Sequence, residues 1–143
     1  MNIRFPYKML QAYNACCRGL CQELKIPQTA FDILLFLGNN PALNTARDIV
    51  EVRKIKANLV SVNVDRLVQE GYLERRSVPG DRRKAYLVCT EKAKPVIRRG
   101  QEIQAAFFRR LFDGVDEELQ EKFRRVIRAV EENLDTMIEE AQG

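Results

Sequence analysis

The densest group of side chains that could bind a ligand is a cluster of basic residues, which follows a sequence typical of a turn. Residues 79–81 read Pro-Gly-Asp, a sequence typical of a tight turn, and Arg82, Arg83 and Lys84 come directly after it. Arginine donates paired hydrogen bonds to phosphate and suits a narrow, electronegative groove of a nucleic acid. We expect the Asp81 carboxylate to fix Arg83 by a charged hydrogen bond and so hold the shape of the turn. The alternative is a solvated turn without a ligand, because charged turns are common.

The positive charge of the chain is concentrated in one segment. The 143 residues carry a net charge of +4, with 24 Lys and Arg against 20 Asp and Glu. Residues 53–84 hold nine basic and four acidic residues, a net charge of +5, so the rest of the chain carries −1. Such an excess is expected of a protein that binds a polyanion, although a solvated charged face is the simpler alternative.

The use of histidine and cysteine argues against catalysis and against metal binding. The chain has no histidine, which removes the commonest general base and the commonest metal ligand. The four cysteines, Cys16, Cys17, Cys21 and Cys89, do not have the paired spacing of a structural zinc site. The sequence also has no Gly-rich phosphate loop and no nucleophile elbow. We therefore expect no enzyme, no cofactor and no metal.

The cysteines near the N-terminus allow two interpretations. Cys17 falls on the apolar stripe of the first predicted helix, so core packing is its expected role. Cys16 and Cys21 flank that stripe, and partial exposure would make them candidates for a redox-sensing thiol. Arg18 is the neighbouring basic residue that could lower a thiol pKa.

Hydrophobic periodicity predicts a mainly α fold with a small β-hairpin. Apolar residues recur every three to four positions in several segments, and β-forming residues flank the turn between residues 72 and 89. Thr45, with Asp48 three positions on, is expected to cap the third helix, and Thr90 to cap the fifth. The predicted helices span about 7–24, 28–37, 46–52, 56–70, 91–112 and 116–141, and the predicted strands 72–77 and 84–89.

The order of these elements predicts a winged helix-turn-helix domain. The third and fourth helices form a helix-turn-helix, whose second helix can lie in the DNA major groove while the hairpin reaches a neighbouring groove or phosphates. In the fourth helix Val60, Val64 and Leu67 are expected to face inward. The candidate DNA contacts, each of which could also be an ordinary surface residue, are Lys56, Asn58, Ser61, Asn63, Thr45, Arg82, Arg83 and Lys84.

The two ends of the chain are predicted to form a dimer interface. Apolar stripes run through the first and last helices and exceed what a small central domain could bury, although packing within one chain is the alternative. We divide the chain into a dimerisation helix at 1–26, a winged helix-turn-helix domain at 27–94 and C-terminal dimerisation helices at 95–143. No apolar run is long enough to span a bilayer and the N-terminus has no secretory pattern, so we expect a cytoplasmic protein.

Two stretches of the central domain form a specific sequence pattern. Residues 81–92 read Asp-Arg-Arg-Lys-Ala-Tyr-Leu-Val-Cys-Thr-Glu-Lys, and residues 59–76 lead through a Gly-Tyr-Leu step into a basic strand. Together they resemble the recognition helix and wing of the MarR family of bacterial transcription regulators, whose signature reads Asp-x-Arg, a strand and Leu-Thr-Glu-x-Gly. Cys89 and Ala93 depart from that pattern. Asn63 stands where an apolar residue is common, which leaves open whether it faces DNA or the core.

The resemblance implies a homodimer whose terminal helices interlock and whose two winged helices bind a pseudo-palindromic operator in double-stranded DNA. It further implies a transcription regulator, expected to be a repressor. Many relatives release DNA when a small aromatic effector enters the cleft between dimer arm and winged helix, and others respond to oxidation of a cysteine. A winged helix used for protein contacts alone is the alternative, and the concentrated basic segment argues against it.

Overall fold

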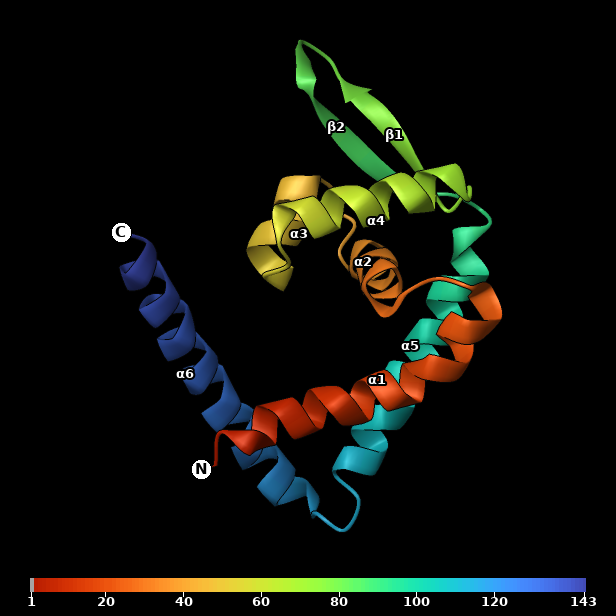
Figure 1. The fold of residues 1–143 in the computed structure, drawn as a ribbon. Coiled ribbons are helices and arrows are strands. Elements are labelled where there is room, and N and C mark those ends of the chain that lie inside the picture. The colour runs from red at the N-terminus through yellow and green to blue at the C-terminus, as the bar shows by residue number, and fades with distance from the viewer. Residues whose placement is uncertain (1) are drawn as a thin grey trace. The chain divides into compact units, whose positions relative to one another are not determined.

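The computed structural model describes residues 2–143 and has a mainly α fold with one two-stranded antiparallel sheet (Figure 1). Helices α1 to α4 come first, followed by the hairpin β1–β2 and then by α5 and α6. The chain forms two compact units, divided in sequence between Phe107 and Phe108, and α6 belongs to the second. Within residues 2–143, no helix combines the length and the apolar character that crossing a membrane requires.

α2 is the central helix of the first unit. It spans Gln28–Asn39 and buries five consecutive side chains, at residues 33–37, as expected of a helix covered on all sides. α1 (Arg4–Leu24) lies against α2 and buries Cys17, Leu20 and Cys21. The predicted role of Cys17 in the core is therefore confirmed.

α3 (Ala46–Arg53) and α4 (Ala57–Gln69) form the predicted helix-turn-helix. The prediction that Thr45 caps α3 is confirmed. The Thr45 hydroxyl accepts a hydrogen bond from the Asp48 N–H, and the Asp48 carboxylate accepts one from the Thr45 N–H, both at 3.1 Å. Lys54 makes the turn after α3 in the left-handed conformation, at φ 55°.

The core of the helix-turn-helix is also as predicted. Val60, Val64 and Leu67 of α4 are all at most 2% exposed, and Ile49 of α3 is fully buried. These side chains share one hydrophobic core with α2. Their burial fixes which face of α4 is turned outward.

The wing is a hairpin of β1 (Leu73–Val78) and β2 (Asp81–Cys89) that projects beyond α4 (Figure 1). The strands pair antiparallel, and Gly80 turns between them at φ +82°, a conformation that a side chain would strain. The Leu87 N–H also donates to the Asn44 carbonyl oxygen at 2.8 Å, so β2 is tied to the loop before α3. The wing is thus fixed to the helix-turn-helix at its base.

Thr90 holds the junction between the wing and α4 and is not a helix cap. Its hydroxyl lies 2.7 Å from the Gly71 carbonyl oxygen and 3.2 Å from that of Tyr72. α5 (Ala93–Leu111) begins after a further turn, so the prediction that Thr90 caps the fifth helix is wrong. Lys92, in that turn, places its Nζ 4.4 Å from the centroid of the Tyr72 ring, a cation–π contact.

Two glycines let α2 and α5 approach closely. A Cβ at Gly100 would lie 2.9 Å from Phe31 Cζ and 3.0 Å from Leu35 Cδ1. A Cβ at Gly38 would lie 2.6 Å from Ile97 Cγ2. Both distances are shorter than two carbon atoms tolerate. The helices can therefore pack this closely only because glycine has no side chain at these two positions.

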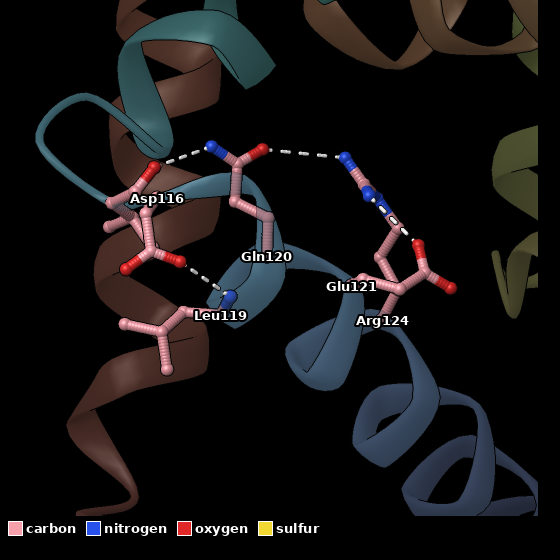
Figure 2. A network of polar contacts seen from close by, with 6 residues as sticks. Asp116, Leu119, Gln120, Glu121 and Arg124 are labelled. Carbon is pink, nitrogen blue, oxygen red and sulfur yellow. Dashed lines mark hydrogen bonds and ion pairs between the residues drawn. The ribbon is translucent and has the colours of Figure 1, made fainter.

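The second unit contains the end of α5 and the long helix α6 (Glu117–Gln142). Figure 2 shows how α6 begins: Asp116 Oδ1 accepts a hydrogen bond from the Leu119 N–H at 2.9 Å, and Gln120 Nε2 donates to the Val115 carbonyl oxygen at 2.7 Å. No side chain of α6 is buried. Its large exposed apolar residues are Leu119, Phe123, Val126, Leu134 and Met137.

The fold class predicted from the sequence is confirmed, including the winged helix-turn-helix order of the elements. The largest differences between the predicted and observed bounds are the first residues of one helix and one strand. The first helix begins at Arg4 rather than Tyr7, and the second strand begins at Asp81 rather than Lys84.

Candidate nucleic-acid interface

The outward face of α4 is set by the residues buried on its opposite side. Because a helix turns by about 100° per residue, Asn58 and Val62 lie nearly opposite the buried Val60 and Leu67. Ser61 lies at the edge of the same outward face. Asn58 and Ser61 are both exposed, so their polar groups are accessible to a ligand.

Asn63 does not belong to this face. It is 7% exposed, and its Nδ2 donates a hydrogen bond to the Leu59 carbonyl oxygen at 2.7 Å, one turn earlier in the helix. The prediction that Asn63 contacts DNA is therefore wrong, since its side chain is buried and its amide is bonded within α4. The Asn63 side chain therefore faces the core and not the outward face of α4.

Lys56 places a positive charge at the start of α4. It is exposed, and no side chain caps the first N–H groups of the helix at this position. Free N–H groups at a helix start and a neighbouring ammonium group both favour an anion such as phosphate. Lys56 and Asn58 thus offer charge and hydrogen bonding at the same end of α4.

A groove between α3, α4 and the wing brings several predicted site residues together. Thr45, Ser61, Arg83 and Lys84 all line it, although they come from three different parts of the sequence. Thr45 uses its hydroxyl oxygen to accept the capping bond from Asp48, and its O–H remains able to donate. Lys56, Asn58 and Arg82 lie outside the lining of this groove, on the helix face and the wing.

The start of β2 presents three cations without acidic partners. Arg82, Arg83 and Lys84 are exposed, and within residues 2–143 none of them forms an ion pair. Asp81 does stabilise the turn, but the predicted partner atom is wrong. Asp81 Oδ1 accepts a hydrogen bond from the Arg83 backbone N–H at 2.9 Å, and the Arg83 guanidinium is left available to a phosphate.

Sequence reasoning missed three residues of this face. Val62 is 65% exposed at the centre of the outward face of α4. Arg75 of β1 forms an ion pair with Asp65 of α4 and also lines the groove. Helical periodicity alone could have placed Val62 and Asp65 outward, but nothing in the sequence shows that β1 contacts α4 there.

The structure leaves one of the two predicted redox-sensing cysteines accessible. Cys21 is 8% exposed, so the expectation that it is partly exposed is wrong, and burial raises its thiol pKa to about 11. Burial also raises the pKa of Cys17 and of Cys89. A raised pKa lowers the fraction of reactive thiolate at neutral pH. Cys16, which is half-buried, is the remaining candidate.

The described residues offer no metal centre. In residues 2–143, no three His, Cys, Asp or Glu side chains are placed to hold one ion. The exposed residues of α4 and the wing supply amide, hydroxyl and cationic groups, which are the groups that proteins use to contact phosphates and base edges.

Comparison with known proteins agrees with this geometry. The sequence model of the MarR family matches residues 24–84, which include α2, the helix-turn-helix and the first part of the wing. The crystal structure of the transcriptional regulator PA3341 is similar, with 25% identity, a TM-score of 0.81, and 93% of this chain and 97% of that chain covered.

Two further structures share the fold. A MarR protein from Peptoclostridium difficile has 19% identity and a TM-score of 0.84, with 94% of this chain and 87% of that chain covered. A MarR family transcriptional regulator from Listeria monocytogenes, in complex with a 26mer DNA, has 16% identity and a TM-score of 0.84, with 94% and 89% covered. The helix-turn-helix, the basic wing and these matches agree: residues 24–84 match the MarR family model, and the chain shares its fold with these transcriptional regulators.

Proposed function

We propose that the chain binds double-stranded DNA through the outward face of α4 and the wing, and acts as a sequence-specific regulator of transcription. The observation that carries the proposal is the groove in which Ser61 of α4 lies together with Arg83 and Lys84 of the wing. Cations without acidic partners favour the phosphate backbone, and the exposed amide and hydroxyl of α4 favour base edges. The Listeria monocytogenes relative, in complex with DNA, supports the same use of the fold.

The proposal includes a homodimer on a pseudo-palindromic operator. Two symmetric subunits place two recognition helices on DNA, with half-sites about one helical turn apart. The exposed apolar residues of α6 support the dimer, because a single chain leaves them in water. Repression would follow from occupancy of a promoter by this dimer.

A winged helix that binds only proteins is the competing function. The basic segment argues against it, because a protein-only module does not need a net charge of +5 over residues 53–84. A gel-shift assay on random duplex DNA at low salt separates the two, since the electrostatic part of DNA binding does not depend on sequence.

Substitutions can test whether α4 reads bases while the wing anchors phosphates. Asn58→Ala and Ser61→Ala should each cost about 1–3 kcal/mol on a preferred duplex selected from a random pool, and much less on random DNA. Arg83→Ala should weaken binding on both duplexes and reduce the salt slope by about one. Arg128→Ala, which removes the same charge from α6, is the matched control and should bind as the parent does.

Two results would reject this assignment. One is an equal loss on preferred and random duplexes for Asn58→Ala and Ser61→Ala. The other is an Arg83→Ala variant that binds like the parent at two salt concentrations. Asp81→Ala should share part of the Arg83→Ala loss, because it releases the Arg83 backbone N–H without removing the guanidinium.

A further inference from the structure

Val62 is an apolar residue at a position where the first unit itself has no need of one. It is 65% exposed, and its outward direction is shared by Asn58, one turn earlier, and by Asp65, one turn later. The hydrophobic core of the unit is built from the opposite side of α4 and does not include Val62. Helix stability does not favour valine either, because its β-branched side chain loses freedom in a helix.

The surroundings of Val62 indicate what could cover it. Lys56 lies at the start of the same helix, and Arg83 and Lys84 line the groove on the flank of α4 that carries Ser61. This charge is complementary to the two phosphate strands that border a DNA groove. A helix held between those strands turns its central outward residues toward the base edges. In the major groove, the apolar group on those edges is the C5-methyl of thymine.

We propose that Val62 reads the 5-methyl group of a thymine in each half-site, next to the bases contacted by Asn58 and Ser61. The inference rests on the proposed DNA binding and adds to it a specificity-determining contact that is apolar. A valine side chain offers two methyl groups to a thymine methyl and offers nothing to the polar edge of a G·C pair. The preferred half-site should therefore contain an A·T pair at the position that faces the middle of α4.

Leu59 provides a matched control for this inference. It is also exposed and apolar, at 45%, and it lies in the same turn of α4. By helical rotation it lies about 100° around the helix from Asn58, toward the flank, whereas Asp65 lies within about 20° of Asn58. Truncation of Leu59 therefore removes exposed apolar surface from α4 without removing the proposed contact.

The experiment compares thymine with deoxyuracil, which differs only by the missing methyl. A preferred duplex is first selected from a random pool with the parent protein, and each thymine is then replaced singly by deoxyuracil. Affinities are measured for the parent, Val62→Ala and Leu59→Ala. Thermal unfolding of each variant checks the fold, which should change little because both side chains are exposed.

The parent and Leu59→Ala should lose about fourfold in affinity at one thymine per half-site. That factor corresponds to about 0.8 kcal/mol for one buried methyl-sized group. Val62→Ala should bind the thymine duplex more weakly and should not distinguish thymine from deoxyuracil at that position.

The inference is overturned if no thymine shows a deoxyuracil effect in the parent, or if every such effect persists in Val62→Ala. It is also overturned if the loss disappears equally in Leu59→Ala. Failure of the proposed function looks different: the parent would then bind no duplex in the pool at low salt, and no preferred sequence would emerge.

Discussion

Asp32 is a largely buried carboxylate of α2 that pairs with the end of α3. Its side chain is 15% exposed and forms an ion pair with Arg53, at the end of α3, with 3.7 Å between Nη2 and Oδ2. Gln28 Nε2 donates a hydrogen bond to Asp32 Oδ1 at 2.9 Å. Burial raises the pKa of Asp32, although the hydrogen bond from Gln28 and the charge of Arg53 both act to lower it. The net direction shows that the loss of solvent around this carboxylate outweighs its two partners.

A raised pKa makes the contribution of Asp32 to stability depend on pH. The folded state holds the Asp32 proton more tightly than the unfolded chain does, so folding is favoured below the ordinary pKa of aspartate, about 4. This advantage is lost as pH rises through the higher folded-state pKa. The free energy of unfolding of Asp32→Asn minus that of the parent should therefore increase between about pH 4 and neutrality.

Urea unfolding of both proteins across that range measures the difference. The expected increase is about 1.4 kcal/mol for each unit by which the folded-state pKa exceeds the ordinary value. A difference that stays constant with pH, or that shrinks as pH rises, would contradict the role of burial at Asp32.

Single residues mark the limit of what the sequence could predict. Asn63 lies at the edge of the buried face of α4, where helical periodicity does not decide between core and solvent, and its bond to Leu59 depends on the formed helix. At Asp81 the sequence predicted a charged bond to the Arg83 side chain, but the tight turn brings the Arg83 backbone N–H to the carboxylate instead. Val62 was predictable from the periodicity that placed Val60 inward.

Among the elements, α2 and α5 show how close packing can outweigh helix propensity. Gly100 of α5 lies where a Cβ would be 2.9 Å from the ring of Phe31. Gly100→Ala should therefore lower the free energy of unfolding by about 1–3 kcal/mol, because a rigid aromatic ring in the core must shift. This loss exceeds the gain of about 0.5–1 kcal/mol that alanine normally brings to a helix.

Gly19 of α1 provides the matched control for Gly100. A Cβ at Gly19 would meet nothing within 4 Å, so Gly19→Ala should show only the helix-propensity gain. Denaturant unfolding of both variants gives the comparison. A Gly100→Ala variant as stable as Gly19→Ala would show that α2 and α5 have room for the extra methyl group.

Most elements were predictable from the sequence because their signals are local. The cap of α3 by Thr45 and Asp48 lies within four residues, and the turn at Gly80 depends on one backbone conformation. Thr90 was misinterpreted because its partners, the carbonyl groups of Gly71 and Tyr72, are 19 and 18 residues away in sequence. A Thr-Glu pair before a helix resembles a cap until the competing acceptors are in place.

At the scale of the whole molecule, α6 exposes large apolar side chains and buries none of its residues. Its apolar stripe is exposed along the helix, and Leu134 within it is 49% exposed. A second copy of the chain that covers this stripe would explain the pattern, in line with the homodimer proposed above.

Leu134→Glu tests that dimer. A charge buried without a partner costs several kcal/mol, so the variant should dissociate at micromolar concentration, where the parent should sediment at twice the monomer mass. Thr136→Glu is the control, because it adds the same charge about 200° further around α6 and should leave the dimer intact. A parent protein that sediments as a monomer would contradict the proposed dimer.

The salt dependence of duplex DNA binding measures how many phosphates meet the cations of α4 and the wing. If a dimer neutralises about six to ten phosphates, the logarithm of the affinity should fall against the logarithm of the salt concentration with a slope of about −5 to −9. Random and selected duplexes should share most of that slope. A flat response, or no binding at low salt, would contradict the assignment of this surface to DNA.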